Sequence, residues 1–184
     1  MKTSKKRVLL IIDVQYEYLD GGLPIVDSDQ SLPRIHQSIQ IAKEHDIPVV
    51  LIQHLCPPGQ LFGEGGHTAD LEETLLTLPH DQIIQKRKPS SFSDTTLESY
   101  LKEIGCDTVV IAGYMTHMCC DSTARDAYHM GYDVEFLSDA TGTINLTSPQ
   151  GTVDAHLLHD TVLAIQSSMF STVLSVDEWK NSLE

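Results

Sequence analysis

The cysteine at position 119 follows a short apolar run at residues 108–112 and a turn that opens with Gly113. The segment that begins at this cysteine has helical periodicity, so its thiol is expected where a buried strand gives way to a helix. Unpaired backbone N–H groups and the positive end of a helix dipole favour a thiolate at such a place. The pattern predicts that Cys119 is a nucleophile, with backbone donors nearby to hold an oxyanion.

The other cysteines indicate reduced thiols rather than disulfides. Cys120 is expected about 100° further round the same helix and is typical of a small buried apolar residue. Cys56 and Cys106 form no CxxC pair with each other or with the remaining cysteines. The basic start of the chain leads into an apolar run that Asp13 interrupts, too early for a signal peptide or a membrane span. These features predict a cytoplasmic protein.

Two charged residues are candidates to assist the thiol. Asp13 directly follows the apolar run 9–12, and a partly desolvated carboxylate there suits general-base chemistry, although an Asp at this place also caps turns. Lys86 opens a basic cluster and would favour both the carboxylate and the thiolate. Arg87 and Lys88 in the same cluster are more typical of a solvated loop.

Strands and helices alternate along the chain. Residues 56–69 form a long loop rich in proline and glycine that could cover a site. The expected strands are 7–13, 48–54, 82–85, 108–112, 133–137 and 171–174, and the expected helices are 32–44, with Pro33 in the first turn, 95–104, 119–130, 149–168 and 176–183. The alternation predicts one domain over residues 1–184. Its class is α/β, a three-layer αβα sandwich with a six-stranded, mostly parallel sheet of Rossmann-like topology.

The expected strand ends bring the candidate residues together. Asp13 ends the first strand, His54 ends the second, Lys86 follows the third, and the turn to Cys119 follows the fourth. Because parallel α/β sheets place their sites at the carboxyl ends of the strands, these four positions should face one crevice.

Composition excludes two classes of partner. The chain has 12 basic and 26 acidic residues, a net charge of −14, which argues against nucleic acid and against an anionic membrane surface. The acidic residues are scattered, as on a solvated surface. A small-molecule substrate is the expected partner.

Three segments, residues 10–15, 86–92 and 113–124, together resemble the isochorismatase-like cysteine hydrolases, a group that includes nicotinamidases and N-carbamoylsarcosine amidases. The resemblance implies a catalytic triad of Asp13, Lys86 and Cys119. It selects Lys86 over Lys88 because the family lysine stands four residues before the small-residue pair that precedes Phe92.

The resemblance also implies a cis peptide bond between Tyr114 and Met115. This bond would place the Met115 N–H beside that of Cys119 as a two-donor oxyanion hole. The candidates for the substrate pocket are Gln15, Tyr18, His54, Phe92 and Tyr114.

The activity implied is cleavage of a C–N bond in a small amide, carbamoyl or ureido compound through a thioester on Cys119, without a cofactor. One alternative is an isochorismatase-type ether hydrolase, which needs no cysteine nucleophile. Another is a catalytically silent binding or assembly member, and a redox thiol protein is disfavoured by the missing CxxC partner. The family also implies a homodimer or homotetramer, with the helix after Cys119 as a candidate interface.

Family members that act on nicotinamide look like Asp-x-His with a further histidine downstream. These residues bind a divalent metal. The corresponding residues 52–57 lack the aspartate, and only His54 and His67 remain, so no metal is expected. His156 and His159 are expected to have surface or interface roles, and Trp179 is expected to anchor the last helix by packing.

Overall fold

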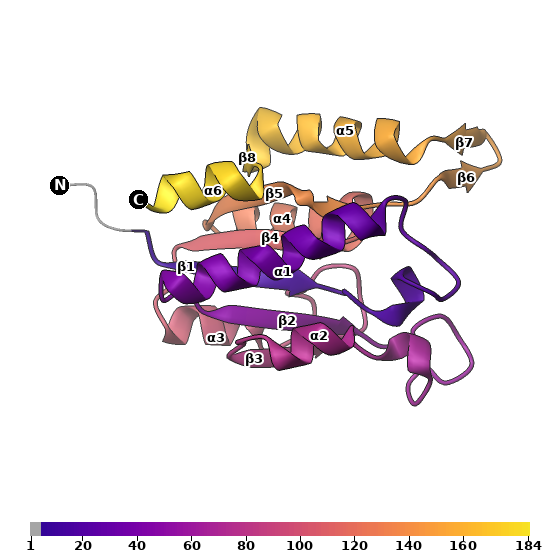
Figure 1. Cartoon of the computed structure of the whole chain (residues 1–184), viewed down its shortest axis with the longest axis horizontal. Helices are drawn as coiled ribbons and strands as arrows, with labels where there is room; N and C mark the ends of the chain where they lie inside the picture. Colours follow the sequence, from indigo (N-terminus) through magenta and orange to yellow (C-terminus); the bar gives the residue numbers. More distant parts are fainter. Residues whose placement is uncertain (1–4) are drawn as a thin grey trace.

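The computed structural model describes residues 5–184 and has a parallel sheet at its centre (Figure 1). The strand order is β3-β2-β1-β4-β5-β8, and every neighbouring pair is parallel. The strands are β1 (Arg7–Ile12), β2 (Val49–His54), β3 (Gln82–Lys86), β4 (Thr108–Tyr114), β5 (Asp133–Gly142) and β8 (Thr172–Leu174). All six predicted strands are present, and the predicted α/β class is confirmed.

Helices cover both faces of the sheet. In Figure 1, α1 crosses in front of the sheet, whereas α3 and α4 lie behind it. Ile35 of α1 and Trp179 of α6 belong to one hydrophobic core, and Leu101 of α3 belongs to the other. The helices are α1 (Ser28–Glu44), α2 (Glu73–Thr77), α3 (Leu97–Glu103), α4 (Asp121–His129), α5 (Ala155–Ile165) and α6 (Val176–Leu183). Shorter helical segments are η1 (Tyr16–Tyr18), η2 (His67–Ala69) and the π-helical turns η3 (Thr116–Cys120) and η4 (Gln166–Phe170).

The two central strands, β1 and β4, end at the same edge of the sheet. Ile12 of β1 pairs with Gly113 of β4, so the residues that follow both strands emerge side by side. Gly113 has a φ of 111°, and a Cβ added to it would lie 2.1 Å from the carbonyl oxygen of Ile12. Only glycine therefore permits this approach, which positions the turn after β4 against the end of β1.

The predicted helix over residues 149–168 is wrong in its first part. Residues 146–153 form an antiparallel hairpin of β6 (Leu146–Ser148) and β7 (Gly151–Val153). The turn contains Pro149, and Gly151 has a φ of 131°, a conformation that interrupts a helix. Helix α5 starts only after Asp154, whose side chain accepts the N–H groups of the first turn.

Three other helix boundaries differ from the prediction. Helix α1 begins at Ser28, after Asp27 in a left-handed conformation, so Pro33 lies inside the helix rather than in its first turn. Helix α3 begins at Leu97, whose N–H donates to the hydroxyl of Thr95. The helical segment expected to start at the nucleophilic cysteine starts earlier, in the turn η3, and α2 was not predicted.

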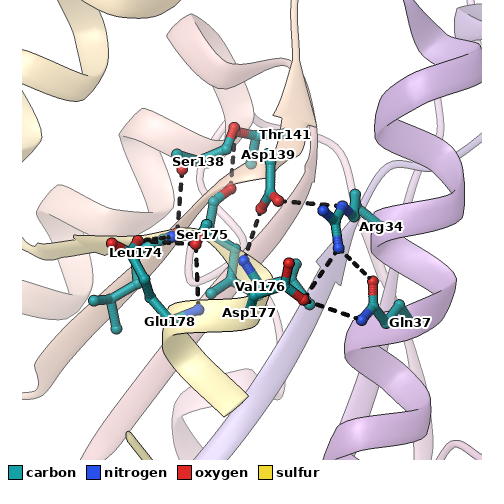
Figure 2. Close-up of polar contacts among 11 residues, drawn as sticks. Arg34, Gln37, Ser138, Asp139, Thr141, Leu174, Ser175, Val176, Asp177 and Glu178 are labelled. Atoms are coloured by element: carbon teal, nitrogen blue, oxygen red, sulfur yellow. Dashed lines mark hydrogen bonds and ion pairs between the residues drawn. The ribbon is translucent and has the colours of Figure 1, made fainter. Parts of the chain in front are cut away.

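The last helix is fixed to the sheet by polar contacts (Figure 2). Ser175 and Glu178 form a capping box at its start. The N–H of Val176 donates to Asp139 of β5, and Arg34 of α1 pairs with both Asp139 and Asp177. Trp179 packs as the predicted anchor of this helix and is fully buried.

Candidate active site

The side chain of Lys86, the last residue of β3, joins the ends of three strands. Its Nζ lies 2.8 Å from Oδ2 of Asp13, directly after β1, and donates to Sγ of Cys119 at 3.3 Å. Cys119 lies in η3, the turn after β4. The side chains of Asp13 and Lys86 are 0% exposed, and Cys119 is 4% exposed. The structure thus brings the three predicted residues into one buried cluster at the carboxyl edge of the sheet.

The neighbouring candidates lie elsewhere. Lys88 is 61% exposed and pairs with Asp94 on the surface, and Arg87 pairs with Glu64 of the long loop. Cys120 is fully buried in the core between the sheet and α3 and α4. Lys86 and Cys119, rather than these neighbours, therefore lie in the cluster with Asp13, and their catalytic role stays a prediction.

Asp13 has an unusual backbone and an under-satisfied side chain. Its φ of 51° lies in the left-handed region, which Asp tolerates better than most residues. Its carbonyl oxygen, rather than its side chain, accepts the N–H of Gln15 in the following turn. Neither carboxylate oxygen accepts a well-aligned hydrogen bond among residues 5–184, although Lys86 lies at ion-pair distance. The carboxylate is therefore directed at Lys86 instead of capping the turn, and it keeps capacity to take a proton.

Burial sets the protonation of the cluster. Burial, followed by the charge of Asp13, raises the pKa of the Cys119 thiol, and the opposing effect of Lys86 is smaller. Burial alone would lower the pKa of Lys86, but the charges of Asp13 and Cys119 outweigh it and raise that pKa. Desolvation therefore opposes the effect expected of the helix dipole and favours the protonated thiol, which needs a base to remove its proton.

The turn between β4 and Cys119 has the cis peptide bond that the resemblance implied, and the oxyanion hole stays a prediction. The peptide bond between Tyr114 and Met115 is cis. The carbonyl oxygen of Met115 accepts the N–H groups of Met118 and Cys120. The N–H of Met115 donates to no backbone or side-chain acceptor within residues 5–184.

His54, at the end of β2, also contacts the cluster. Its Nδ1 lies 2.9 Å from Nζ of Lys86, and burial, then the charge of Lys86, lowers its pKa. Asp13, His54 and Cys119 each offer a ligand atom within 4.8 Å of the others, a spacing that a metal ion could use. Nζ of Lys86 contacts all three, however, so an ammonium stands where such an ion would bind.

 His67, the second histidine of the metal-binding pattern, lies apart from His54. His67 is 64% exposed, stacks on Tyr16 with ring centroids 4.3 Å apart, and lies 3.9 Å from carboxylate oxygens of Asp20 and Asp70. Gln53, which stands beside His54, donates to the carbonyl oxygen of Ala69. His54 and His67 therefore do not share a ligand set in the described part of the chain. A site without metal stays a prediction.

The predicted pocket residues have different surroundings. The amide of Gln15 holds the backbone of His54 through two hydrogen bonds and donates to Ala69 as well, so it braces the site. The hydroxyl of Tyr114 bonds to Ser31 of α1. Phe92 stacks on Tyr132, in the core on the side of the sheet that α3 covers. Tyr18 is buried beside Phe62, and its burial, followed by the charges of Cys119 and Asp13, raises its pKa.

A cover over the cluster was not predicted in any detail. Phe62, from the long loop 56–69, packs edge-on against His54 and Tyr18, with ring centroids 5.3 and 5.0 Å away. The buried carboxylate of Glu17 accepts the N–H groups of Phe62 and Gly22, and so ties this loop to the loop after β1. The sequence marked the loop as a cover but carried no signal for Phe62 or Glu17.

Two histidine–threonine pairs support the turn that carries Cys119. Nδ1 of His159 in α5 lies 2.9 Å from the hydroxyl of Thr116, and His117 pairs with Thr143 after β5. His159 is half-buried and hydrogen-bonded to the turn, and its expected interface role stays a prediction. His156 is exposed, as expected, and pairs with Asp27.

Comparisons with known proteins place the chain in a family. A family model described as the isochorismatase domain matches residues 7–178. The secreted isochorismatase effector Isc1 of Verticillium dahliae is 33% identical over 94% of this chain and 90% of its own length. Nicotinamidase 3 of Arabidopsis thaliana is 27% identical over 98% of this chain and 90% of its own length. A solved structure of a candidate isochorismatase from Burkholderia xenovorans has a TM-score of 0.96 and 37% identity, over 98% of this chain and 88% of that one. The chain therefore belongs to the isochorismatase family of hydrolases.

No helix within residues 5–184 combines the length and the apolar character that crossing a membrane requires. The cytoplasmic location stays a prediction, and the Verticillium relative is named as a secreted protein.

Proposed function

We propose that this protein is a cysteine hydrolase that cleaves a C–N bond of a small amide, carbamoyl or ureido compound. The observation that carries the proposal is the contact of Lys86 Nζ with both Asp13 and Cys119 inside a buried cluster. A nucleophile, a carboxylate and a cation at this spacing suit acyl transfer. The amidase name of the Arabidopsis relative supports the same reaction class.

The first half-reaction forms a thioester. Asp13 takes the thiol proton as Cys119 attacks the carbonyl carbon, and the N–H groups of Met115 and Cys119 hold the oxyanion. The C–N bond then breaks, and ammonia or an amine leaves with the proton from Asp13. Lys86 stabilises the negative charge on whichever partner carries it during these steps, which suits its raised pKa and its position between them.

The second half-reaction restores the thiol. Asp13 removes a proton from water, the hydroxide attacks the thioester, and the C–S bond breaks. Cys119 leaves as a thiolate and regains its proton from Asp13. The products are a carboxylic or carbamic acid and the free enzyme.

Ammonia release tests the proposal directly. Purified protein is incubated with a library of small amides and ureides, and ammonia is measured alongside the Cys119→Ala variant. We expect hydrolysis by the wild type to exceed that of the variant by about 10⁴-fold or more, since nucleophile loss disables a catalytic unit. Mass spectrometry after rapid quenching should find an acyl group on Cys119.

The control is Cys120→Ala, which removes the adjacent buried thiol and should leave the acyl adduct on Cys119. Equal hydrolysis by wild type and Cys119→Ala would overturn the nucleophile assignment. Cleavage of an ether substrate that survives Cys119→Ala would favour the alternative ether hydrolase. Absence of any turnover, with an unreactive Cys119, would favour a silent family member.

The expected homodimer or homotetramer is also a proposal. It is supported by large apolar side chains that are exposed on α4 and α5, among them Tyr128 and Leu157. Such side chains mark contact surfaces when they gather in patches. Light scattering after size-exclusion chromatography measures the mass in solution, and a monomer at micromolar concentration would contradict the proposal.

A further inference from the structure

The ammonium of Lys86 has four polar atoms close to it. Nζ lies 2.8 Å from Oδ2 of Asp13, 2.9 Å from Nδ1 of His54, 3.1 Å from the carbonyl oxygen of Lys88 and 3.3 Å from Sγ of Cys119. A lysine ammonium has three N–H donors and no acceptor. Nδ1 of His54 is then the unprotonated nitrogen of its ring, because a protonated Nδ1 would face an ammonium that cannot accept its hydrogen.

This contact fixes the tautomer of His54. A neutral imidazole carries a single N–H, so with Nδ1 as acceptor the hydrogen resides on Nε2. Burial and the neighbouring Lys86 lower the pKa of His54, which keeps the ring neutral near pH 7. Nε2 has no hydrogen-bond partner within residues 5–184. It is open to solvent, unlike the buried unpartnered oxygens of Asp13.

The ring is also held in place from the outside. Gln15 bonds to both the N–H and the carbonyl oxygen of His54, and β2 pairs with β3 so that His54 lies opposite Lys86. Phe62 packs edge-on against the imidazole. The ring that carries this N–H donor thus has a fixed orientation, and one of its nitrogens lies within 4.8 Å of Sγ of Cys119.

We propose that His54 is a substrate-recognition residue whose Nε2–H donates to an acceptor oxygen next to the carbonyl that Cys119 attacks. This inference rests on the proposed function. It narrows the substrate class to amides or ureides that carry a second carbonyl or carboxylate oxygen close to the scissile group. A substrate with an N–H donor at that place would meet another donor and be rejected.

The tautomer is tested without substrate. Long-range ¹H–¹⁵N NMR of histidine-labelled protein distinguishes the two neutral tautomers and the imidazolium, and His54→Asn assigns the signal. We expect His54 to show the Nε2–H form at pH 7 to 8. A Nδ1–H form, or an imidazolium at pH 7, would overturn the inference. His80→Asn, which removes a histidine that bonds to Leu78, is the matched control for assignment.

Recognition is tested by binding to the Cys119→Ala variant, which cannot turn over. The probes are two matched pairs, oxamate with acetamide and N-carbamoylglycine with ethylurea. The first member of each pair carries the extra acceptor oxygens. We expect that member to shift the His54 Nε2–H signal and to bind about 10-fold to 100-fold more tightly, the range for one hydrogen bond to a ligand oxygen. Equal binding of both members of each pair, with no shift of this signal, would overturn the inference.

Two variants at position 54 separate recognition from support of Lys86. An asparagine keeps an acceptor near the place of Nδ1 and lacks the distal donor, so His54→Asn should lose the preference. A glutamine can present an N–H near the place of Nε2, so His54→Gln should keep part of it. If both variants kept the full preference, the assignment would be contradicted. Because these readouts are tautomer and binding, they are independent of hydrolysis, and failure of the proposed C–N cleavage would show separately as absent ammonia release.

Discussion

Two clusters of charged side chains join neighbouring elements of this fold, and they differ in their access to water. Lys86 and Asp13 lie 2.8 Å apart, with both side chains at 0% exposure. Arg34 lies at 3.3 Å from Asp139 and 3.2 Å from Asp177 (Figure 2), with side chains 31% to 60% exposed. The distances are similar, but water screens the second cluster and not the first.

The carboxylates of the two clusters also differ in how well their hydrogen-bonding capacity is satisfied. Asp139 accepts the N–H of Val176, and Asp177 accepts from Gln37, so the exposed cluster is well satisfied. The oxygens of Asp13 lack an aligned hydrogen bond within residues 5–184. A buried pair contributes little net stability because desolvation offsets its attraction. Stability therefore does not account for the buried cluster, whereas the proposed acyl transfer does. The exposed cluster is accounted for by its role in holding α6.

The largest effect is expected when the buried pair is broken. Lys86→Met leaves the carboxylate of Asp13 buried without its cation, which should destabilise the protein by about 3–5 kcal/mol. Urea unfolding followed by circular dichroism measures this change. Under conditions in which Lys86→Met remains folded, it should no longer hydrolyse the substrate.

The matched control is the double variant Lys86→Met/Asp13→Asn. It removes the unpaired charge, so it should recover much of the stability that Lys86→Met loses. A double variant as unstable as the single one would show that packing, rather than an unpaired charge, causes the loss.

A third ion pair, between Arg7 and Glu135, gives an effect of intermediate size. Burial alone raises the pKa of Glu135, but hydrogen bonds and charge from Arg7 and Lys5 outweigh it and hold the pKa below its ordinary value of 4.5. A depressed folded-state pKa contributes stability above the unfolded value, and this contribution is lost as pH falls through the folded value. Glu135→Gln should therefore cost about 2 kcal/mol at pH 7. The difference between variant and wild type should shrink below pH 4.5 in urea unfolding at stepped pH. A gap that stays constant down to pH 3 would contradict the ion-pair explanation.

The cover over the buried cluster gives a smaller effect. Phe62→Ala removes the ring that packs on His54 and Tyr18, so the loop should open more often. A loss of about 1.4 kcal/mol of closing free energy would raise the alkylation rate of Cys119 by iodoacetamide about tenfold. Peptide mapping by mass spectrometry measures the rate, and Leu61→Ala in the same loop, which removes an exposed side chain, is the control. Equal rates in both variants would show that Phe62 does not limit access.

The sequence predicted the buried cluster because its members follow apolar strands. Parallel strands end at one edge of a sheet, so Asp13, Lys86 and the turn to Cys119 were expected to meet there. The choice of Lys86 over Lys88 came from the family resemblance, since both follow the same strand. Periodicity could not decide between them, whereas the structure buries one side chain and exposes the other.

Other features of the site depend on contacts that leave no periodic pattern. Phe62 and Glu17 meet across two loops, and His159 reaches Thr116 from a helix far along the chain. Burial, which raises the pKa of the Cys119 thiol, is likewise not fixed by a strand-to-helix turn alone. The hairpin before α5 was missed because its residues 149–153 were assigned to the helix that follows.

The smallest effect is expected in the exposed cluster. Arg34→Met removes the cation between Asp139 and Asp177, but both carboxylates keep access to water and to other donors. The cost should be about 0.5 kcal/mol, as for other exposed ion pairs, and it should decrease further in 1 M salt. Urea unfolding of Arg34→Met beside Lys86→Met compares the two clusters directly. A cost above about 2 kcal/mol for Arg34→Met would show that the exposed cluster is coupled to the fold more strongly than its screening allows. In that case, access to water would not be the property that separates the two clusters.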